Sequence, residues 1–207
     1  KITEKPLDDG GKLSQGESIK ALYMSRTVFY GDTSLDIFKA ELKKHACNAV
    51  MIDYKDENGY IYFNSQNKTA AQIGAFERYN PNDEKILEDF KNEGYKIIAR
   101  VCCFADPLAA SHISGAPVLD KKGNIWLSDS AINGGSSYLD PYSKEAKKYL
   151  KSIIGDVART KPDMIFLDKI GFPDGKNIEN AAFAGELGGT STRYQTLSDF
   201  VKEIRLE

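Results

Sequence analysis

Residues 161–175 read Lys161-Pro162-Asp163-Met164-Ile165-Phe166-Leu167-Asp168-Lys169-Ile170-Gly171-Phe172-Pro173-Asp174-Gly175. The apolar run of this stretch is too short for a helix, ends in a carboxylate and then breaks into a turn containing glycine and proline. This pattern is typical of a buried parallel strand whose carboxyl end enters a site. Alternation would place Met164, Phe166 and Asp168 on one face of that strand. Asp168 would then lie at the sheet edge where (β/α) barrels carry their chemistry, although it can equally cap the turn that follows.

The chain contains four expected strand–helix units, of which this stretch starts the last. The expected strands are Ala21–Tyr30, Ala49–Asp53, Lys96–Phe104 and the strand that ends at Asp168. The expected helices begin at Asp32 or Thr33, at Asn80-Pro81 and at Asp140-Pro141, and the last runs through Tyr194, Leu197, Phe200, Val201 and Ile204. The helix from Asp140-Pro141 is expected to have an apolar stripe of Ala146, Tyr149, Leu150, Ile153 and Val157. Strands that alternate with helices predict parallel pairing and right-handed crossovers. A complete eight-unit barrel typically needs about 250 residues, so this α/β chain is expected to form the first four or so units of a (β/α)8 barrel of the TIM-barrel type.

The composition indicates one globular domain. Residues 1–18 are rich in Lys, Asp, Gly and Ser and are expected to form a flexible leader, which leaves 19–207 as a single domain. The net charge of −2 comes from mixed signs, so the chain offers no basic surface for nucleic acid. No apolar run approaches the roughly 20 residues of a membrane span. The chain starts at Lys1 rather than at Met, which fits a secreted or cell-envelope protein whose signal sequence has been removed.

The cysteines and histidines are too few for a disulfide framework or a zinc site. Cys102 and Cys103 are neighbours in an apolar strand, Cys47 lies near a helix end, and the chain has two histidines. We therefore expect buried free thiols, no metal and no cofactor.

Two loops depart from the strand–helix rhythm. Asn58-Gly59 lies between aromatic residues and predicts a hairpin over Lys55–Phe63. The polar segment from there to Tyr79 is long for a βα loop, and such loops often bind ligands. A second hairpin is expected over Val118–Trp126. Its Trp126 is either a platform for a sugar ring or an anchor that fixes the loop.

Four segments, in this order and spacing, resemble the putative glycosyl hydrolase domain family (DUF4015), which is grouped with the glycosidase-like TIM barrels. The resemblance covers about Lys20 to Gly175. The segments are NAVMIDYKD (48–56), IIARVCCFADPL (97–108), YLDPYSKE (138–145) and the stretch around Asp168. The resemblance implies a bacterial enzyme that hydrolyses O-glycosyl bonds in a poly- or oligosaccharide.

The last segment departs from the family pattern, which is Phe-Asp-Tyr-x-Arg-Phe-Pro. This chain has Leu167-Asp168-Lys169-Ile170-Gly171-Phe172-Pro173, so the Asp and the Phe-Pro match. Lys169 replaces the aromatic residue and Gly171 replaces the arginine. Because that arginine bears on substrate binding and catalysis, a carbohydrate-binding protein without chemistry stays an alternative to the enzyme.

Glycoside hydrolysis normally uses two carboxyl groups, about 5 Å apart for retention and roughly 6.5–9.5 Å apart for inversion. Asp53 and Asp168 end strands that are two spacings apart, roughly 10 Å, which is too far for a retaining pair and marginal for an inverting one. We therefore predict that Asp168 is the nucleophile or stabilises the oxocarbenium ion, with its acid partner on a strand beyond residue 207. Arg100, on the strand between them, is expected to keep Asp168 ionised.

The other candidate site residues are expected to contact substrate beside Arg100. They are Lys55, Asp56, Lys169, Trp126 and Asp140, with Asp53 as a second catalytic candidate. For Asp53, Lys55 and Asp56, the alternative is a salt-bridge network that closes the top of the sheet. For Asp140, a helix cap is the favoured alternative, because Asp-Pro has the N-cap, N1 order.

Three interpretations of the chain follow from these observations. The first is a glycosidase acting on an extracellular or cell-wall polysaccharide, and the second is a carbohydrate-binding protein on the same scaffold. The third is a half-barrel that forms a homodimer, because a fourth strand without a neighbour would leave an apolar sheet edge exposed.

Overall fold

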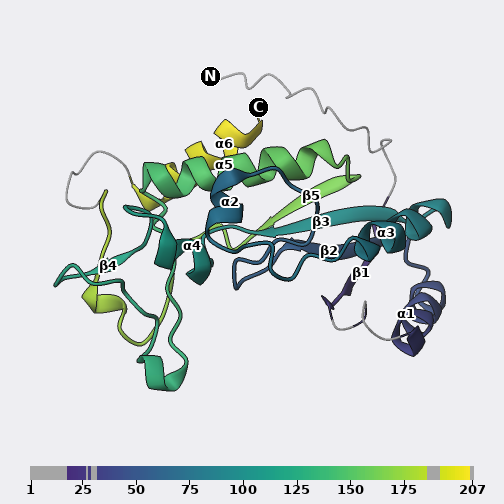
Figure 1. Cartoon of the computed structure of the whole chain (residues 1–207), viewed down its shortest axis with the longest axis horizontal. Helices are drawn as coiled ribbons and strands as arrows, with labels where there is room; N and C mark the ends of the chain where they lie inside the picture. The colour runs from purple at the N-terminus through teal and green to yellow at the C-terminus, as the bar shows by residue number, and fades with distance from the viewer. Residues whose placement is uncertain (1–17, 27, 29–31, 186–191, 206–207) are drawn as a thin grey trace.

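The computed structural model describes residues 18–26, 28, 32–185 and 192–205, and its centre is a parallel sheet (Figure 1). The strand order is β1 (Ala21–Met24), β2 (Ala49–Lys55), β3 (Lys96–Cys102) and β5 (Met164–Asp168). All three pairings are parallel, so the carboxyl ends of the strands lie at one edge. The predicted α/β fold with four strand–helix units is confirmed. The predicted leader falls almost wholly outside the described residues.

Four helices follow these strands, and all lie on one face of the sheet. They are α1 (Asp32–Lys44), α3 (Asn82–Asn92), α5 (Lys144–Arg159) and α6 (Arg193–Arg205). Because the strand order never reverses, right-handed crossovers carry every helix to the same side. We call the side covered by helices the outer face and the opposite side the inner face.

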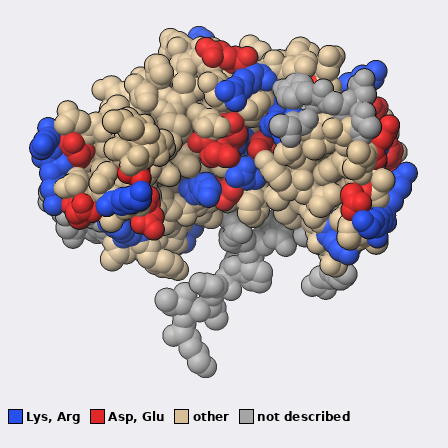
Figure 2. Space-filling view, turned by 90° about the horizontal axis from the view of Figure 1, so that it is seen from below, with Lys and Arg blue, Asp and Glu red and all other residues tan. Residues whose placement is uncertain are grey.

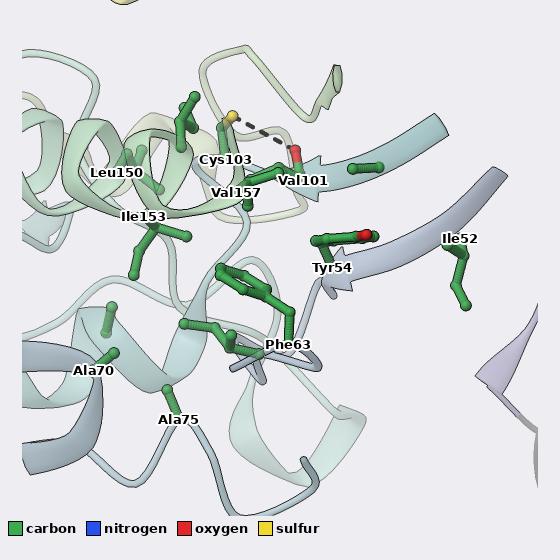
Figure 3. Packing of buried hydrophobic residues seen from close by; sticks show 14 of the residues in the cluster. Ile52, Tyr54, Phe63, Ala70, Ala75, Val101, Cys103, Leu150, Ile153 and Val157 are labelled. Atoms are coloured by element: carbon green, nitrogen blue, oxygen red, sulfur yellow. Dashed lines mark hydrogen bonds between the residues drawn. The ribbon is translucent and has the colours of Figure 1, made fainter. Parts of the chain in front are cut away.

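The outer face forms the hydrophobic core with the helices. Its side chains on β2 and β3 are at most 1% exposed: Val50, Ile52, Ile97, Ala99 and Val101. The predicted apolar stripe of α5 covers them, and all its members are buried: Ala146, Tyr149, Leu150, Ile153 and Val157. Figure 3 shows Leu150, Ile153 and Val157 turned toward side chains of β2 and β3 and toward Phe63.

The inner face is only partly covered: Ile98 and Cys102 on β3 are 5% and 0% exposed, but other side chains of this face are accessible. Tyr23 on β1 is 42% exposed and Phe166 on β5 is 44% exposed, although both are large and apolar. Strand alternation puts these rings on the same side as Asp53, Arg100 and Asp168, because Arg100 is the register partner of both Asp53 and Phe166. The chemistry-bearing side chains therefore lie on the face of the sheet opposite to the four described helices.

Two long connections meet in a small second sheet at the carboxyl edge of the strands. We call residues 113–140 and 169–185 the lobe. In it, β4 (Leu119–Asp120) pairs antiparallel with β6 (Ala181–Ala182), which joins the connection after β3 to the connection after β5. The lobe has its own apolar cluster around Val118, Trp126 and Phe183, and Figure 1 shows it beyond the strand ends. It also contains the short 3-10 helices η2 (Ala131–Asn133) and η3 (Ile178–Asn180).

Both predicted hairpins are turns in the structure, with little strand beyond them. Gly59 has a φ of +94°, and a single antiparallel bridge joins Lys55 to Ile61. Gly123 has a φ of +87° in the second hairpin, where the N–H of Trp126 bonds the carbonyl of Val118 at 2.9 Å. The polar segment before Tyr79 contains a short helix, α2 (Lys68–Gln72), that was not expected. The strands β1 and β3 end earlier than predicted, and the predicted cap at Asp32 or Thr33 concerns side chains outside the described part of the chain.

The two Asp-Pro pairs behave differently, and one prediction is wrong. Asp106-Pro107 starts a helix, α4 (Pro107–His112), in which the Asp106 carboxylate accepts the N–H of Ala109 at 2.7 Å. Asp140-Pro141 was expected to do the same for α5, but that helix begins three residues later at Lys144. Its N-cap is Ser143, whose Oγ accepts the N–H of Ala146 at 3.1 Å.

Asp140 is engaged elsewhere, which is why it cannot cap α5. Its two carboxylate oxygens accept the N–H groups of Tyr142 and Ala184, each at 2.9 Å. Ala184 follows β6, so this buried carboxylate ties the start of the α5 region to the lobe.

Candidate active site

The site is centred on Arg100, which lies on β3 between two carboxylates. Its Nη1 donates to Asp53 Oδ1 at 2.5 Å. Its Nε donates to Asp168 Oδ2 at 2.8 Å, and its Nη2 lies 2.7 Å from the same oxygen. The structure therefore brings together the predicted arginine and the two predicted carboxylates at the carboxyl edge of the sheet. Viewed from below, charged side chains of both signs are grouped near the middle of the molecule (Figure 2).

The charges of this group stabilise one another. Burial by itself would raise the pKa of Asp168, but hydrogen bonds from Arg100 and from the N–H of Lys169 lower it below its ordinary value. Burial would lower the pKa of Arg100, and the two carboxylates raise it instead. Asp168 is thus a carboxylate at neutral pH, and its side chain is 29% exposed. These properties suit a nucleophile or an oxocarbenium-stabilising group and do not suit a general acid.

Asp53 is bound more tightly than Asp168 and is less accessible. Its second oxygen accepts the hydroxyl of Tyr23 at 2.6 Å, and the residue is 4% exposed. Burial and this hydrogen bond raise the pKa of Tyr23 well above its ordinary value, so the phenol stays a donor. Both oxygens of Asp53 are therefore engaged within the protein, which fits the positioning of Arg100 better than contact with substrate.

Lys169 lies beside Asp168 and has an unusual backbone. Its φ is +53°, in the left-handed region that residues other than glycine rarely adopt. The N–H of Lys169 donates to Asp168 Oδ1 at 2.7 Å. Its side chain is exposed, so it remains available at the rim of the site.

Lys55 does not line the cleft, and the reason is a β-bulge. The register passes from Asp53 opposite Arg100 directly to Lys55 opposite Val101, which leaves Tyr54 as the extra residue. Lys55 is thereby turned to the buried side, where it is 0% exposed. Its Nζ donates to the carbonyl of Cys102 at 2.7 Å and lies 2.9 Å from Asp106 Oδ2.

Asp56 also has a local structural role. It is 6% exposed, and its Oδ1 accepts the N–H groups of Asn58 at 3.0 Å and of Tyr60 at 2.9 Å. Its other oxygen accepts the hydroxyl of Tyr62 at 3.0 Å. Both oxygens therefore hold the turn together, in the manner of an Asx-turn.

Trp126 and Asp140 lie in the lobe and not beside Arg100. Trp126 is 2% exposed, and its Nε1 donates to the carbonyl of Asn177 at 2.8 Å. Of the two interpretations of this tryptophan, the loop anchor is the one that the structure supports. Asp140, 2% exposed, has the tying role described above.

Sequence reasoning missed two residues of the site. Tyr23 belongs to it because alternation along β1 turns its ring to the inner face, a signal that the sequence contains. Glu57 Oε2 lies 3.6 Å from Arg100 Nη1, and its side chain is 56% exposed. Its position follows from the turn after β2, so no periodicity in the sequence points to it.

Within the described residues, no group of three or more histidine, cysteine or acidic side chains is arranged to hold a metal ion. Cys102 and Cys103 are buried free thiols, as predicted, and burial raises their pKa values to about 11 and about 12. Cys47 is free and only partly buried. None of the described helices is long and apolar enough to cross a bilayer.

Solved structures share this architecture. A hypothetical protein from Ruminiclostridium thermocellum ATCC 27405 is similar with a TM-score of 0.76 and 27% identity, over 89% of this chain and 91% of that chain. Alpha-L-fucosidase isoenzyme 2 from Paenibacillus thiaminolyticus is similar with a TM-score of 0.56 and 16% identity, over 82% of this chain and 25% of that chain. A GH31 dextranase from Flavobacterium johnsoniae, complexed with glucose, is similar with a TM-score of 0.55 and 16% identity, over 89% of this chain and 23% of that chain.

The fucosidase and the dextranase are too distant in sequence to show more than the fold. This chain spans about a quarter of the length of each. Among curated proteins, none matches this chain in sequence. The model of the DUF4015 family, described as "Putative glycosyl hydrolase domain", matches residues 21–207, so the chain belongs to that family.

Proposed function

We propose that the protein is a glycoside hydrolase that acts on an extracellular or cell-wall polysaccharide and is itself secreted or attached to the cell envelope. Family membership and the fold shared with two glycosidases support this class of reaction. The observation that carries the proposal is Asp168, an ionised and accessible carboxylate at the carboxyl edge of a parallel sheet, held by Arg100.

Each residue of the group has a distinct part in this proposal. Asp168 attacks the anomeric carbon or stabilises the oxocarbenium ion that forms there. Arg100 keeps Asp168 deprotonated and fixes the direction of its lone pairs. Asp53 and Tyr23 hold Arg100 in place from the other side. Lys169 lies at the rim, where its ammonium can contact sugar hydroxyl groups.

The departure at Gly171 bears on substrate binding. A Cβ at this position would meet no atom within 4 Å, so a side chain could start here without a clash. Gly171 offers no side-chain donor where the family pattern has an arginine. This observation favours the second candidate function, a carbohydrate-binding protein, which the same experiment tests.

The test is hydrolysis of a panel of bacterial polysaccharides and oligosaccharides by the wild type and by Asp168→Asn. Asp174→Asn is the matched control, because the exposed Asp174 likewise accepts the N–H of the residue that follows it, at 2.7 Å. We expect the wild type and the control to release reducing sugar, and Asp168→Asn to lose at least about 10³-fold in kcat/KM. Binding of a panel member without turnover, unchanged in Asp168→Asn, would replace the enzyme by the binding protein.

A further inference from the structure

We propose that Glu57 is the general acid and base that works with Asp168, in place of the acid partner expected on a strand beyond residue 207; this inference rests on the proposed function. Two steps carry it. The loop after β2 is built so that Glu57 is its free carboxylate, and the resulting position puts that carboxylate against the same guanidinium as Asp168.

The loop from Lys55 to Tyr60 is fixed by every charged residue in it except Glu57. Lys55 is buried against Asp106, beneath the loop. Asp56 accepts two backbone N–H groups of the loop itself. Gly59 packs so closely on Asp106 that a Cβ there would lie 2.2 Å from its Oδ1. Such a clamped loop presents its remaining carboxylate in a defined place, which is what a positioned proton donor requires.

That place is the open side of Arg100. Glu57 Oε2 lies 3.6 Å from Arg100 Nη1, and Asp168 Oδ2 lies 2.7 Å from Arg100 Nη2. Two oxygens that contact nitrogens of one planar guanidinium are no more than about 9 Å apart. This bound includes both the roughly 5 Å of a retaining pair and the roughly 6.5–9.5 Å of an inverting pair, and the retaining reaction is part of the proposal. With its side chain 56% exposed, Glu57 can also move toward a bound sugar.

Of the three carboxylates around Arg100, Glu57 is the one least restrained by hydrogen bonds. Protonating Asp53 would disturb hydrogen bonds from Arg100 and Tyr23, and protonating Asp168 would disturb those from Arg100 and the N–H of Lys169. Glu57 contacts Arg100 only at 3.6 Å, beyond hydrogen-bond distance.

The reaction then balances over two steps. The glycosidic C–O bond breaks, its oxygen takes the proton of Glu57, and Asp168 forms a bond to the anomeric carbon. Water then attacks that carbon, loses its proton to Glu57 and releases Asp168 as a carboxylate. The net change is the addition of one water molecule across the glycosidic bond, with retention at the anomeric carbon.

The experiment compares two leaving groups on the same sugar. The probes are methyl and 2,4-dinitrophenyl glycosides of glucose, galactose, fucose and N-acetylglucosamine in both anomeric forms. A methoxide leaving group needs a proton, whereas dinitrophenolate leaves without one. Wild type, Glu57→Gln, Glu57→Ala and Asp168→Asn are assayed beside Glu88→Gln, which removes the charge of an exposed glutamate on α3, away from the site. Thermal melts verify that each variant is folded.

We expect Glu57→Gln to lower kcat/KM at least about 100-fold on the methyl glycoside and much less on the dinitrophenyl glycoside. Asp168→Asn should lose activity on both. Sodium azide should raise the rate of Glu57→Ala on the dinitrophenyl substrate and yield a glycosyl azide of retained configuration.

Other results would overturn the assignment. If Glu57→Gln behaves like Glu88→Gln, or loses both substrates to the same extent, Glu57 is not the acid, and the proposed function still stands on Asp168. If the wild type cleaves neither the glycosides nor the polysaccharide panel, the proposed function fails, and the assignment of Glu57 fails with it.

Discussion

The two faces of one parallel sheet differ in almost every physical property. On the outer face, Val50, Ile97 and Val101 are completely buried under helices. On the inner face, the strands present Tyr23, Asp53, Arg100, Phe166 and Asp168, with a partly buried ion network between two exposed rings. Alternation along each strand thus separates the residues that stabilise the fold from those that can do chemistry. Removing the charged groups of the inner face from water is unfavourable for folding. Burial of the apolar side chains of the outer face offsets that cost.

The bulge at Tyr54 decides on which face of the sheet the side chain of Lys55 lies. Without it, Lys55 would follow Asp53 onto the inner face; with it, Lys55 crosses to the buried side and pairs with Asp106. Substitutions on each face, and at Lys55, measure what these residues contribute to the free energy of unfolding and to the pKa of Asp168.

The largest effect is expected from Lys55→Met, because it leaves the Asp106 carboxylate buried without its cation. We expect a loss of about 3–5 kcal/mol in the free energy of unfolding, measured by urea titration. The control is Lys55→Met combined with Asp106→Asn, which removes the orphaned charge and keeps an oxygen for the cap of α4. If the double variant is no more stable than the single one, the buried ion pair is not the cause.

The next effect compares one apolar residue from each face. Ile97→Ala on the outer face should cost about 2–5 kcal/mol, because it opens a cavity among buried side chains. Phe166→Ala on the inner face should cost less than half of that, since water already reaches 44% of the residue. Equal losses would mean that Phe166 is covered in solution. Light scattering would then show a dimer, as the half-barrel interpretation expects.

A smaller effect is expected on the charge of Asp168 when its partner is removed. In Arg100→Met, burial is no longer opposed by the guanidinium, so the pKa of Asp168 should rise from below its ordinary 3.8 to above it. Carbon-detected NMR titration of labelled aspartates measures this change directly. A pKa that stays low in the variant would assign the depression to the N–H of Lys169 alone.

The smallest effect is the contribution of Asp168 to stability at acid pH. Because folding lowers its pKa, the stabilisation is present above the ordinary value of 3.8 and is lost as the pH falls through the folded value. The free energy of unfolding of the wild type should exceed that of Asp168→Asn by at most about 1 kcal/mol at pH 6, and the difference should vanish near pH 2. A difference that grows on acidification would contradict the sign.

Much of the fold follows from local patterns in the sequence. The strand ending at Asp168, the apolar stripe of α5 and the meeting of Asp53, Arg100 and Asp168 all follow from periodicities of two and 3.6 residues together with parallel pairing. These patterns are short-range, and the outer-face burial that they imply is observed for every predicted member of the α5 stripe.

The wrong or incomplete predictions involve contacts between segments that are distant in the sequence. Asp140 has the same local signal as Asp106, yet it accepts the N–H of Ala184 and does not cap α5. Trp126 is buried because Asn177 and Phe183 reach it from beyond β5. A dipeptide or a lone tryptophan contains no information about such a partner.

The alternation of strands and helices, the apolar faces and the aspartates at the strand ends all follow from local sequence, because each depends on the spacing of neighbouring residues. The burial of Lys55, the support of Asp53 by Tyr23 and the position of Glu57 against Arg100 depend on how distant segments pack. The physical reason is that a bulge of one residue and a tight turn redirect side chains without altering the hydrophobic pattern.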